Sequence, residues 1–212
     1  MKSHYFFTSA VLATLAFTPL AQAATVLGVS VQSTSGNSYK SILDPEYSRV
    51  ASSFTTGSGP GWTLNSATFT IDSFEVNDLS AYIYDDNLGI PGTVQATVML
   101  ADVPALGINN VTFDFSASGL TLNPNTSYWL AIEQTTGASA ESSWARPDST
   151  YSTTGLPGWT IGGELRVNAN PNWEPITPHP GLFSIEVTAI PEPSSSVALL
   201  ALGGLALLRR RR

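Results

Sequence analysis

The sequence predicts an all-β protein, a jelly-roll-like antiparallel β-sandwich with one hydrophobic helix at each end of the chain. Residues 24–190 contain no segment in which apolar residues keep a helical spacing over three turns. Short segments rich in Val, Ile, Thr and aromatic residues alternate instead with clusters of Gly, Pro, Asn and Asp. The chain has 212 residues, which leaves room for one such domain between its two ends.

Residues 1–23 predict a secretory signal peptide, which signal peptidase would remove. Lys2 supplies a positive charge, and the segment from Tyr5 to Leu20 is mostly apolar. Ala21 and Ala23 are the small side chains that precede a cleavage site, so the mature chain would begin at Ala24. The alternative is a buried helix or strand at the start of the domain.

Ten segments of the middle domain, residues 24–190, are predicted to be strands. The alternation is clearest in residues 67–72, where apolar side chains occupy every second position. Ten short strands at this spacing favour two packed sheets. The predicted strands are Thr25–Val31, Ser48–Thr55, Thr63–Ser73, Leu79–Tyr84, Val94–Asp102, Asn110–Phe115, Ser127–Glu133, Ser142–Arg146, Glu164–Val167 and Leu182–Ile190.

One predicted turn carries three adjacent side chains with oxygen atoms, Asp85, Asp86 and Asn87. Asp and Asn bond to nearby backbone groups, and the Gly89 and Pro91 that follow are typical turn residues. Calcium prefers such oxygen ligands, but the spacing does not match an EF-hand loop. We therefore expect a structural turn and no cofactor, with a weak calcium site as the alternative.

The charge and the cysteine content exclude several classes of function. Residues 24–190 carry 4 basic against 15 acidic side chains, a net charge of −11. Such a domain has too few cations to bind nucleic acid through its phosphates. The chain has no Cys, which excludes disulfides, thiolate nucleophiles and cysteine-ligated metals.

We expect no enzymatic activity, because the candidate catalytic residues form no strong pattern. His179 lies between two prolines, and the chain has no Gly-x-Ser-x-Gly motif. A glycosidase needs two carboxylates, and the best candidates are Glu133, Glu164 and Glu174, each near a Trp in the sequence. Surface acids that keep the domain soluble explain these residues more simply.

The tryptophans divide into core and loop candidates. Trp129 lies in a predicted strand beside Leu130 and is expected in the core. Trp62, Trp159 and Trp173 neighbour Gly or Asn, which places them in loops or at strand edges. There an exposed ring could bind a sugar, so these three are the candidate ligand-binding residues. The alternative is that their rings anchor loops on the core.

The C-terminal segment, residues 191–212, has three parts. Pro191, Glu192 and Pro193 are followed by a serine run and by the apolar segment from Val197 to Leu208. This segment would form a short membrane helix, below the ~20 residues of a full span. Four arginines end the chain and would remain in the cytoplasm: Arg209, Arg210, Arg211 and Arg212.

This order of parts resembles the PEP-CTERM sorting signal of Gram-negative bacteria. The resemblance implies that an exosortase recognises the Pro-Glu-Pro motif and removes the tail during export. The helix would then hold the chain in the inner membrane only transiently, before the protein reaches the cell surface or the extracellular space. The alternative is an ordinary, weak C-terminal membrane anchor.

The middle of the chain resembles the choice-of-anchor R domain. That family has no agreed catalytic residues, so the resemblance implies an exported, surface-associated β domain and no chemistry. The matching segments are ASSFTTG at 51–57, AYIYDDN at 81–87, GIPG at 89–92, GLTL at 119–122, NTSYWL at 125–130, and Trp144.

We therefore expect an exported, exosortase-processed surface or extracellular-matrix protein with a non-catalytic β-sandwich. Its expected partners are signal peptidase, the exosortase and, transiently, the membrane. One alternative is a carbohydrate-binding module for exopolysaccharide. The other is a glycan-active hydrolase, which the weak carboxylate pattern disfavours.

Overall fold

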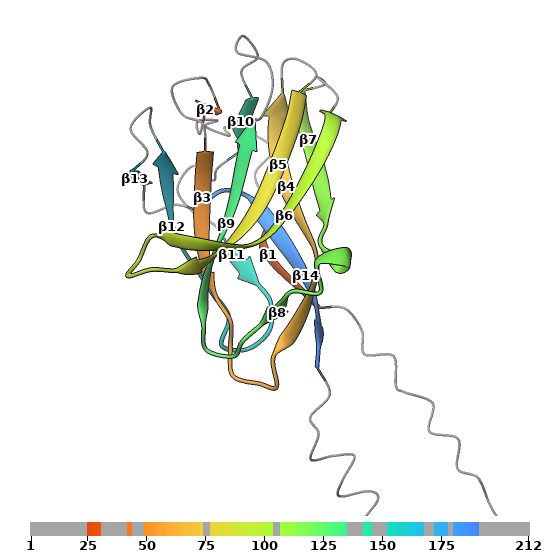
Figure 1. Cartoon of the computed structure of the whole chain (residues 1–212), viewed down its shortest axis with the longest axis vertical. Coiled ribbons are helices and arrows are strands. Elements are labelled where there is room, and N and C mark those ends of the chain that lie inside the picture. Colours follow the sequence, from red (N-terminus) through yellow and green to blue (C-terminus); the bar gives the residue numbers. More distant parts are fainter. Residues whose placement is uncertain are drawn as a thin grey trace, which may run out of the picture.

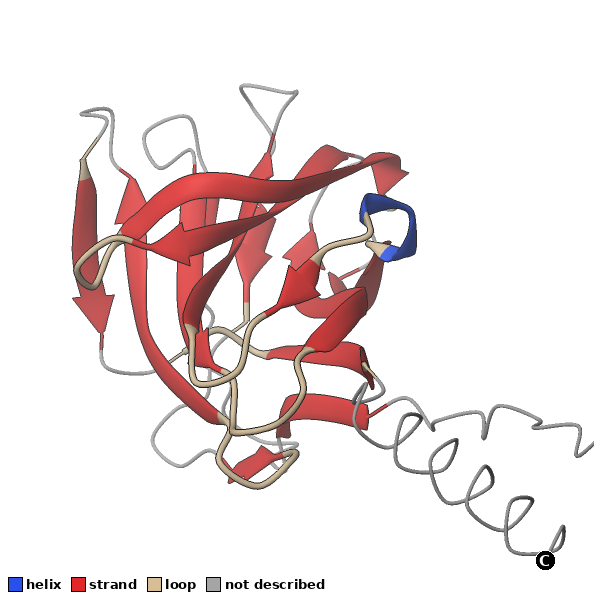
Figure 2. Cartoon of the chain, turned by 60° about the horizontal axis from the view of Figure 1, so that its bottom comes forward, coloured by secondary structure: helices blue, strands red, loops and turns tan. Residues whose placement is uncertain are grey.

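The computed structural model shows two antiparallel β-sheets that enclose one hydrophobic core (Figure 1). Apart from the strands, the described part of the chain has one short 3₁₀ turn, Ser116–Ser118, blue in Figure 2. The structure describes residues 25–30, 42–43, 49–73, 77–103, 107–134, 142–145, 152–167, 172–177 and 180–190.

The first sheet has eight strands, with β4 at its centre. The path runs β11 (Ser152–Thr154), β1 (Thr25–Ser30), β14 (Phe183–Ala189), β4 (Trp62–Ser73), β10 (Ser142–Trp144) and β2 (Ile42–Leu43). Two further strands, β7 (Gly107–Asp114) and β8 (Thr121–Leu122), also pair with β4. Because β4 is long, it serves as the common partner of four other strands.

The second sheet has six strands, and its long β5–β6 hairpin forms one edge. The order is β13 (Trp173–Thr177), β12 (Thr160–Val167), β3 (Arg49–Thr55), β9 (Ser127–Gln134), β5 (Asn77–Asp86) and β6 (Pro91–Val103). The β5–β6 register shifts at three places. Such bulges bend an edge strand and make it a poor template for pairing with another chain.

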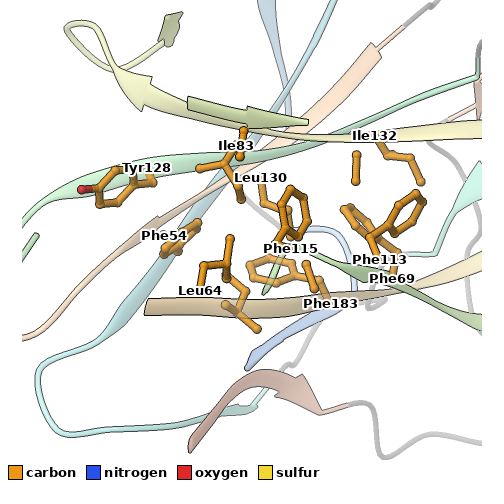
Figure 3. Packing of buried hydrophobic residues seen from close by; sticks show 14 of the residues in the cluster. Phe54, Leu64, Phe69, Ile83, Phe113, Phe115, Tyr128, Leu130, Ile132 and Phe183 are labelled. Carbon is orange, nitrogen blue, oxygen red and sulfur yellow. The ribbon is translucent and has the colours of Figure 1, made fainter. Parts of the chain in front are cut away.

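The core fills the space between the two sheets (Figure 3). The ring of Phe69 of β4 packs edge-on against two other rings, with centroids 5.3 Å from Phe113 and 5.0 Å from Trp144. Ile83 and Leu130 pack from the opposite sheet. Burial of each large apolar side chain contributes about 1.5–3 kcal/mol, so the chain needs no disulfide to hold the sheets together.

All ten predicted strands overlap a strand of the structure, with ends that differ by up to four residues. The prediction of an antiparallel, all-β fold is confirmed, whereas the jelly-roll connectivity stays a prediction. Four strands were not predicted: β2, β8, β11 and β13. The first three are too short to show alternation, and β13 contains Pro175, which is tolerated only at a sheet edge.

The two predicted terminal helices lie outside the described residues, as do the signal-cleavage residues Ala21, Ala23 and Ala24 and the motif Pro191-Glu192-Pro193. Within the described part of the chain, no helix is long and apolar enough to cross a membrane.

Candidate functional site

The outer face of the six-stranded sheet carries a second apolar cluster, on the side opposite the core. In β9, Leu130 and Ile132 point into the core, so the alternate residues Trp129 and Ala131 point outward. Trp129 is only 5% exposed. The expectation that Trp129 is buried is confirmed, but it lies in this outer cluster and not between the sheets.

Two alanines in register form the floor of this cluster. Ala51 of β3 pairs directly with Ala131 of β9, and both are fully buried. The ring of Tyr84 from β5 lies 6.0 Å from the ring of Trp173 from β13, edge-on. Aromatic side chains from strands on both sides therefore meet over a floor of methyl groups, where larger side chains would block them.

Charged and hydroxyl groups sit beside these rings and bond to one another. Arg49 Nε lies 3.2 Å from Glu133 Oε2 as an ion pair, without the geometry of a hydrogen bond. The Tyr82 hydroxyl donates a hydrogen bond of 2.7 Å to the same carboxylate oxygen. The Arg49 guanidinium also lies 5.6 Å from the centroid of the Tyr82 ring, which is a cation–π contact. Its Nη1 donates a 3.4 Å hydrogen bond to the Tyr84 hydroxyl.

We call this set the aromatic face. Its residues share one side of one sheet and come from four strands: Arg49, Ala51, Tyr82, Tyr84, Trp129, Ala131, Glu133 and Trp173.

The aromatic face holds its charges and protons firmly at neutral pH. Burial, with the hydrogen bond and charge of Glu133, raises the pKa of Tyr82 to about 12. Burial also raises the pKa of Tyr84. Burial acts to lower the pKa of Arg49, but Tyr84 and Glu133 outweigh it and the pKa rises. Both phenols are therefore protonated and Arg49 is cationic, a state suited to hydrogen bonding and not to nucleophilic attack.

Trp62 and Trp159 do not have the open ring faces that were expected of loop residues. They are 4% and 7% exposed, and their rings meet edge-on at 5.0 Å. Trp159 also stacks parallel to Phe54 at 6.2 Å. A Cβ at Gly57 would lie 2.5 Å from the carbonyl oxygen of Pro157, so glycine lets these loops approach closely and bury both rings. The loop-anchoring alternative describes these two residues.

Trp173 differs from the other two ligand-binding candidates. It lies in β13 and is half-buried, as one of the residues of the aromatic face. Because Trp173 is partly exposed and its ring lies beside Tyr84, it remains a candidate ligand-binding residue.

Asp85, Asp86 and Asn87 lead into a tight hairpin turn between β5 and β6. Leu88 and Gly89 have φ of 59° and 88°, which is typical of a two-residue type I′ turn. The backbone N–H of Asn87 donates to the Ile90 carbonyl at 2.8 Å.

All four carboxylate oxygens of this turn accept hydrogen bonds. Asp85 accepts from the Thr93 backbone N–H at 2.5 Å and from Gln95 Nε2 at 3.1 Å. Asp86 accepts from Trp129 Nε1 at 2.8 Å and from the Gly89 backbone N–H at 3.2 Å. Among the described residues, no group of three or more acidic or histidine side chains could hold a metal ion.

Of the three glutamates named as catalytic candidates, Glu133 lies on the opposite side of the sheet from the register positions of the other two. Glu133 belongs to the aromatic face. Glu164 pairs in register with Ser52, which lies between the core residues of β3, so both face inward. Glu174 pairs with Arg166, which in turn pairs with the core residue Val50. His179 lies outside the described residues.

The sequence analysis missed Arg49, Tyr82 and Tyr84 as site residues. One available signal was the unbroken apolar run from Tyr128 to Ile132, because a strand that is apolar at consecutive positions is buried on both faces. The contacts themselves join residues far apart in the chain, such as Arg49 and Glu133, and only the sheet register reveals them.

The two ends of the described chain lie on neighbouring strands at one end of the eight-stranded sheet (Figure 1). Thr25, the first residue of β1, pairs with Val187 of β14. The last strand ends at Ala189, and the N–H of Ile190 still donates to the Gly61 carbonyl at 3.0 Å. The ordered pairing of the domain thus reaches the residue directly before Pro191.

Residues 189–212 match the PEP-CTERM protein-sorting motif. The PEP-CTERM segment thus starts at the last residue of β14, without an intervening linker. The motif indicates export to the cell surface through the membrane and processing by an exosortase. The match includes only the last two residues of the domain, so the resemblance of its segments to choice-of-anchor R stays a prediction. No curated protein and no solved structure matches the chain.

Proposed function

We propose that this protein is a cell-surface or extracellular-matrix component of a Gram-negative bacterium, with a non-catalytic β-sandwich that the PEP-CTERM segment delivers. The single observation that carries the proposal is the match at residues 189–212, adjoining the last strand of the domain. In this account, signal peptidase cleaves before Ala24, and the exosortase later removes the tail.

The position of the two ends supports this order of events. Both leave the domain from neighbouring strands, β1 and β14, so a folded domain could be held by either end, or by both, at one membrane surface. β14 lies between β1 and β4 in the sheet. Cleavage beyond Ile190 would therefore leave every backbone pair of β14 intact.

The non-catalytic role has separate support from the described residues. Glu133 lies on the opposite side of the sheet from Glu164, so these two carboxylates do not flank a common bond as glycosidase carboxylates do. The choice-of-anchor R assignment, supported by the order of the matching sequence segments, would add that the domain is one of a group of exported surface modules.

A substitution in the motif tests the proposal in a Gram-negative host that contains an exosortase. Glu192→Ala should accumulate the unprocessed chain in the membrane fraction, because the recognised motif is lost. Ser195→Ala is the matched control, since it lies in the same segment but outside the motif, and it should be processed like the wild type. A Glu192→Ala protein with the wild-type mature mass would contradict exosortase processing.

A further inference from the structure

We propose that the aromatic face binds a neutral polysaccharide chain, with Tyr82 and Trp173 as the stacking residues. This inference deepens the proposed function, because an exported domain meets polysaccharide outside the cell. It assigns the binding site to the outer face of the six-stranded sheet, and not to the loops that carry Trp62 and Trp159.

The rings provide the apolar part of such a site. Tyr82 and Trp173 are half-buried, so part of each residue remains exposed. Tyr84 and Trp129 are 4% and 5% exposed and support them from below. A pyranose ring presents a face of C–H groups, and such a face packs well on an aromatic ring that is already fixed. Fixed rings lose little conformational entropy when a ligand binds.

Arg49 and Glu133 provide the polar part. The Arg49 side chain is 39% exposed, and it is held by the Glu133 carboxylate and by the Tyr82 ring. Its planar guanidinium carries five N–H donors, and its Nη1 makes a hydrogen bond to the Tyr84 hydroxyl. Glu133, 17% exposed, offers acceptor oxygens beside it. Sugar hydroxyls both donate and accept, so an adjacent donor and acceptor at a ring edge match their chemistry.

The charge balance favours a neutral polymer over an acidic one. The positive charge of Arg49 is compensated by Glu133 at 3.2 Å. The domain around it carries 15 acidic against 4 basic side chains, so a polyanion would be repelled. This repulsion disfavours uronic acid polymers and nucleic acids, because both are polyanions.

Calorimetric titration of the full chain tests the proposal directly. The chain is kept in a polyoxyethylene detergent, since sugar-based detergents would compete. The probes are four soluble neutral polymers, namely mixed-linkage β-glucan, xyloglucan, galactomannan and dextran, with alginate as the anionic probe. We expect at least one neutral polymer to bind and alginate not to bind. Trp173→Ala and Tyr82→Ala should each weaken that binding by about tenfold or more.

Two matched variants show whether the effect belongs to this face. Tyr82→Phe keeps the ring and should retain most of the affinity. Thr68→Ala, on the outer face of the other sheet, should leave it unchanged. Melting temperatures of all variants confirm that they are folded. Failure of all four neutral polymers to bind, alginate binding alone, or unchanged affinity in Trp173→Ala and Tyr82→Ala would overturn the proposal. None of these results bears on exosortase processing, which the mature mass of Glu192→Ala reports separately.

Discussion

The two outer faces of the sandwich are built from the same alternation of side chains but carry different chemistry. On the eight-stranded sheet, hydroxyl and amide groups pair across strands, as in Thr68 with Thr112 at 2.8 Å and Thr70 with Asn110 at 2.9 Å. On the six-stranded sheet, the equivalent outward positions hold alanines, aromatic rings and one ion pair. The first arrangement is typical of a face in contact with water.

This difference indicates where the domain is specialised. A sandwich needs only its inner faces to be apolar, and the core between the sheets already satisfies that need. The aromatic face adds a second buried cluster that the fold does not require. The outer face of the six-stranded sheet is therefore the better candidate for a binding surface.

Removal of the buried tryptophan of the aromatic face should cost almost as much stability as a substitution in the core. Trp129→Ala removes a side chain that is 5% exposed and leaves Asp86 without its 2.8 Å hydrogen bond from the indole. We expect a loss of about 3 kcal/mol or more in the free energy of unfolding. Thr68→Ala, the control on the other outer face, should cost about 0.5 kcal/mol. Urea denaturation measures both, and equal costs would remove the contrast between the two faces.

The aromatic face should also make the stability of the domain depend on pH in the alkaline range. Tyr82 has a pKa of about 12 in the folded state, against an ordinary value of 10.0. The folded chain therefore holds a proton that the unfolded chain has lost, and stability falls as the pH rises from 10 toward 12. In Glu133→Gln the pKa of Tyr82 should be lower, and this fall should be shallower. Melting temperatures across this range, with ultraviolet titration of tyrosinate, provide the test, and parallel curves would contradict the role of Glu133.

The smallest effect is expected from calcium at Asp85 and Asp86, which lie at the border of the aromatic face. The carboxylate oxygens of Asp85 and Asp86 accept hydrogen bonds from backbone and side-chain donors, including Trp129. Calcium would have to displace these donors. We therefore expect the melting temperature to stay the same on addition of millimolar calcium, with magnesium as the control. A rise specific to calcium would show that the turn binds the ion.

Local sequence patterns were sufficient for ten of the fourteen described strands but not for the site. The period of two in residues 67–72 depends only on neighbours in the chain, and β4 follows it. The pairing of Arg49 with Glu133 depends instead on which strands become neighbours, and no local pattern encodes that. Trp62 and Trp159 show the same limit, because adjacent glycines indicate a loop but not the direction in which the ring packs.

The most direct test of the account is the intact mass of the protein recovered from the cell surface. The account predicts a chain that begins at Ala24 and lacks the apolar segment and terminal arginines of the PEP-CTERM region, residues 189–212 of the match. A surface protein whose mass still includes Arg209 to Arg212 would contradict it.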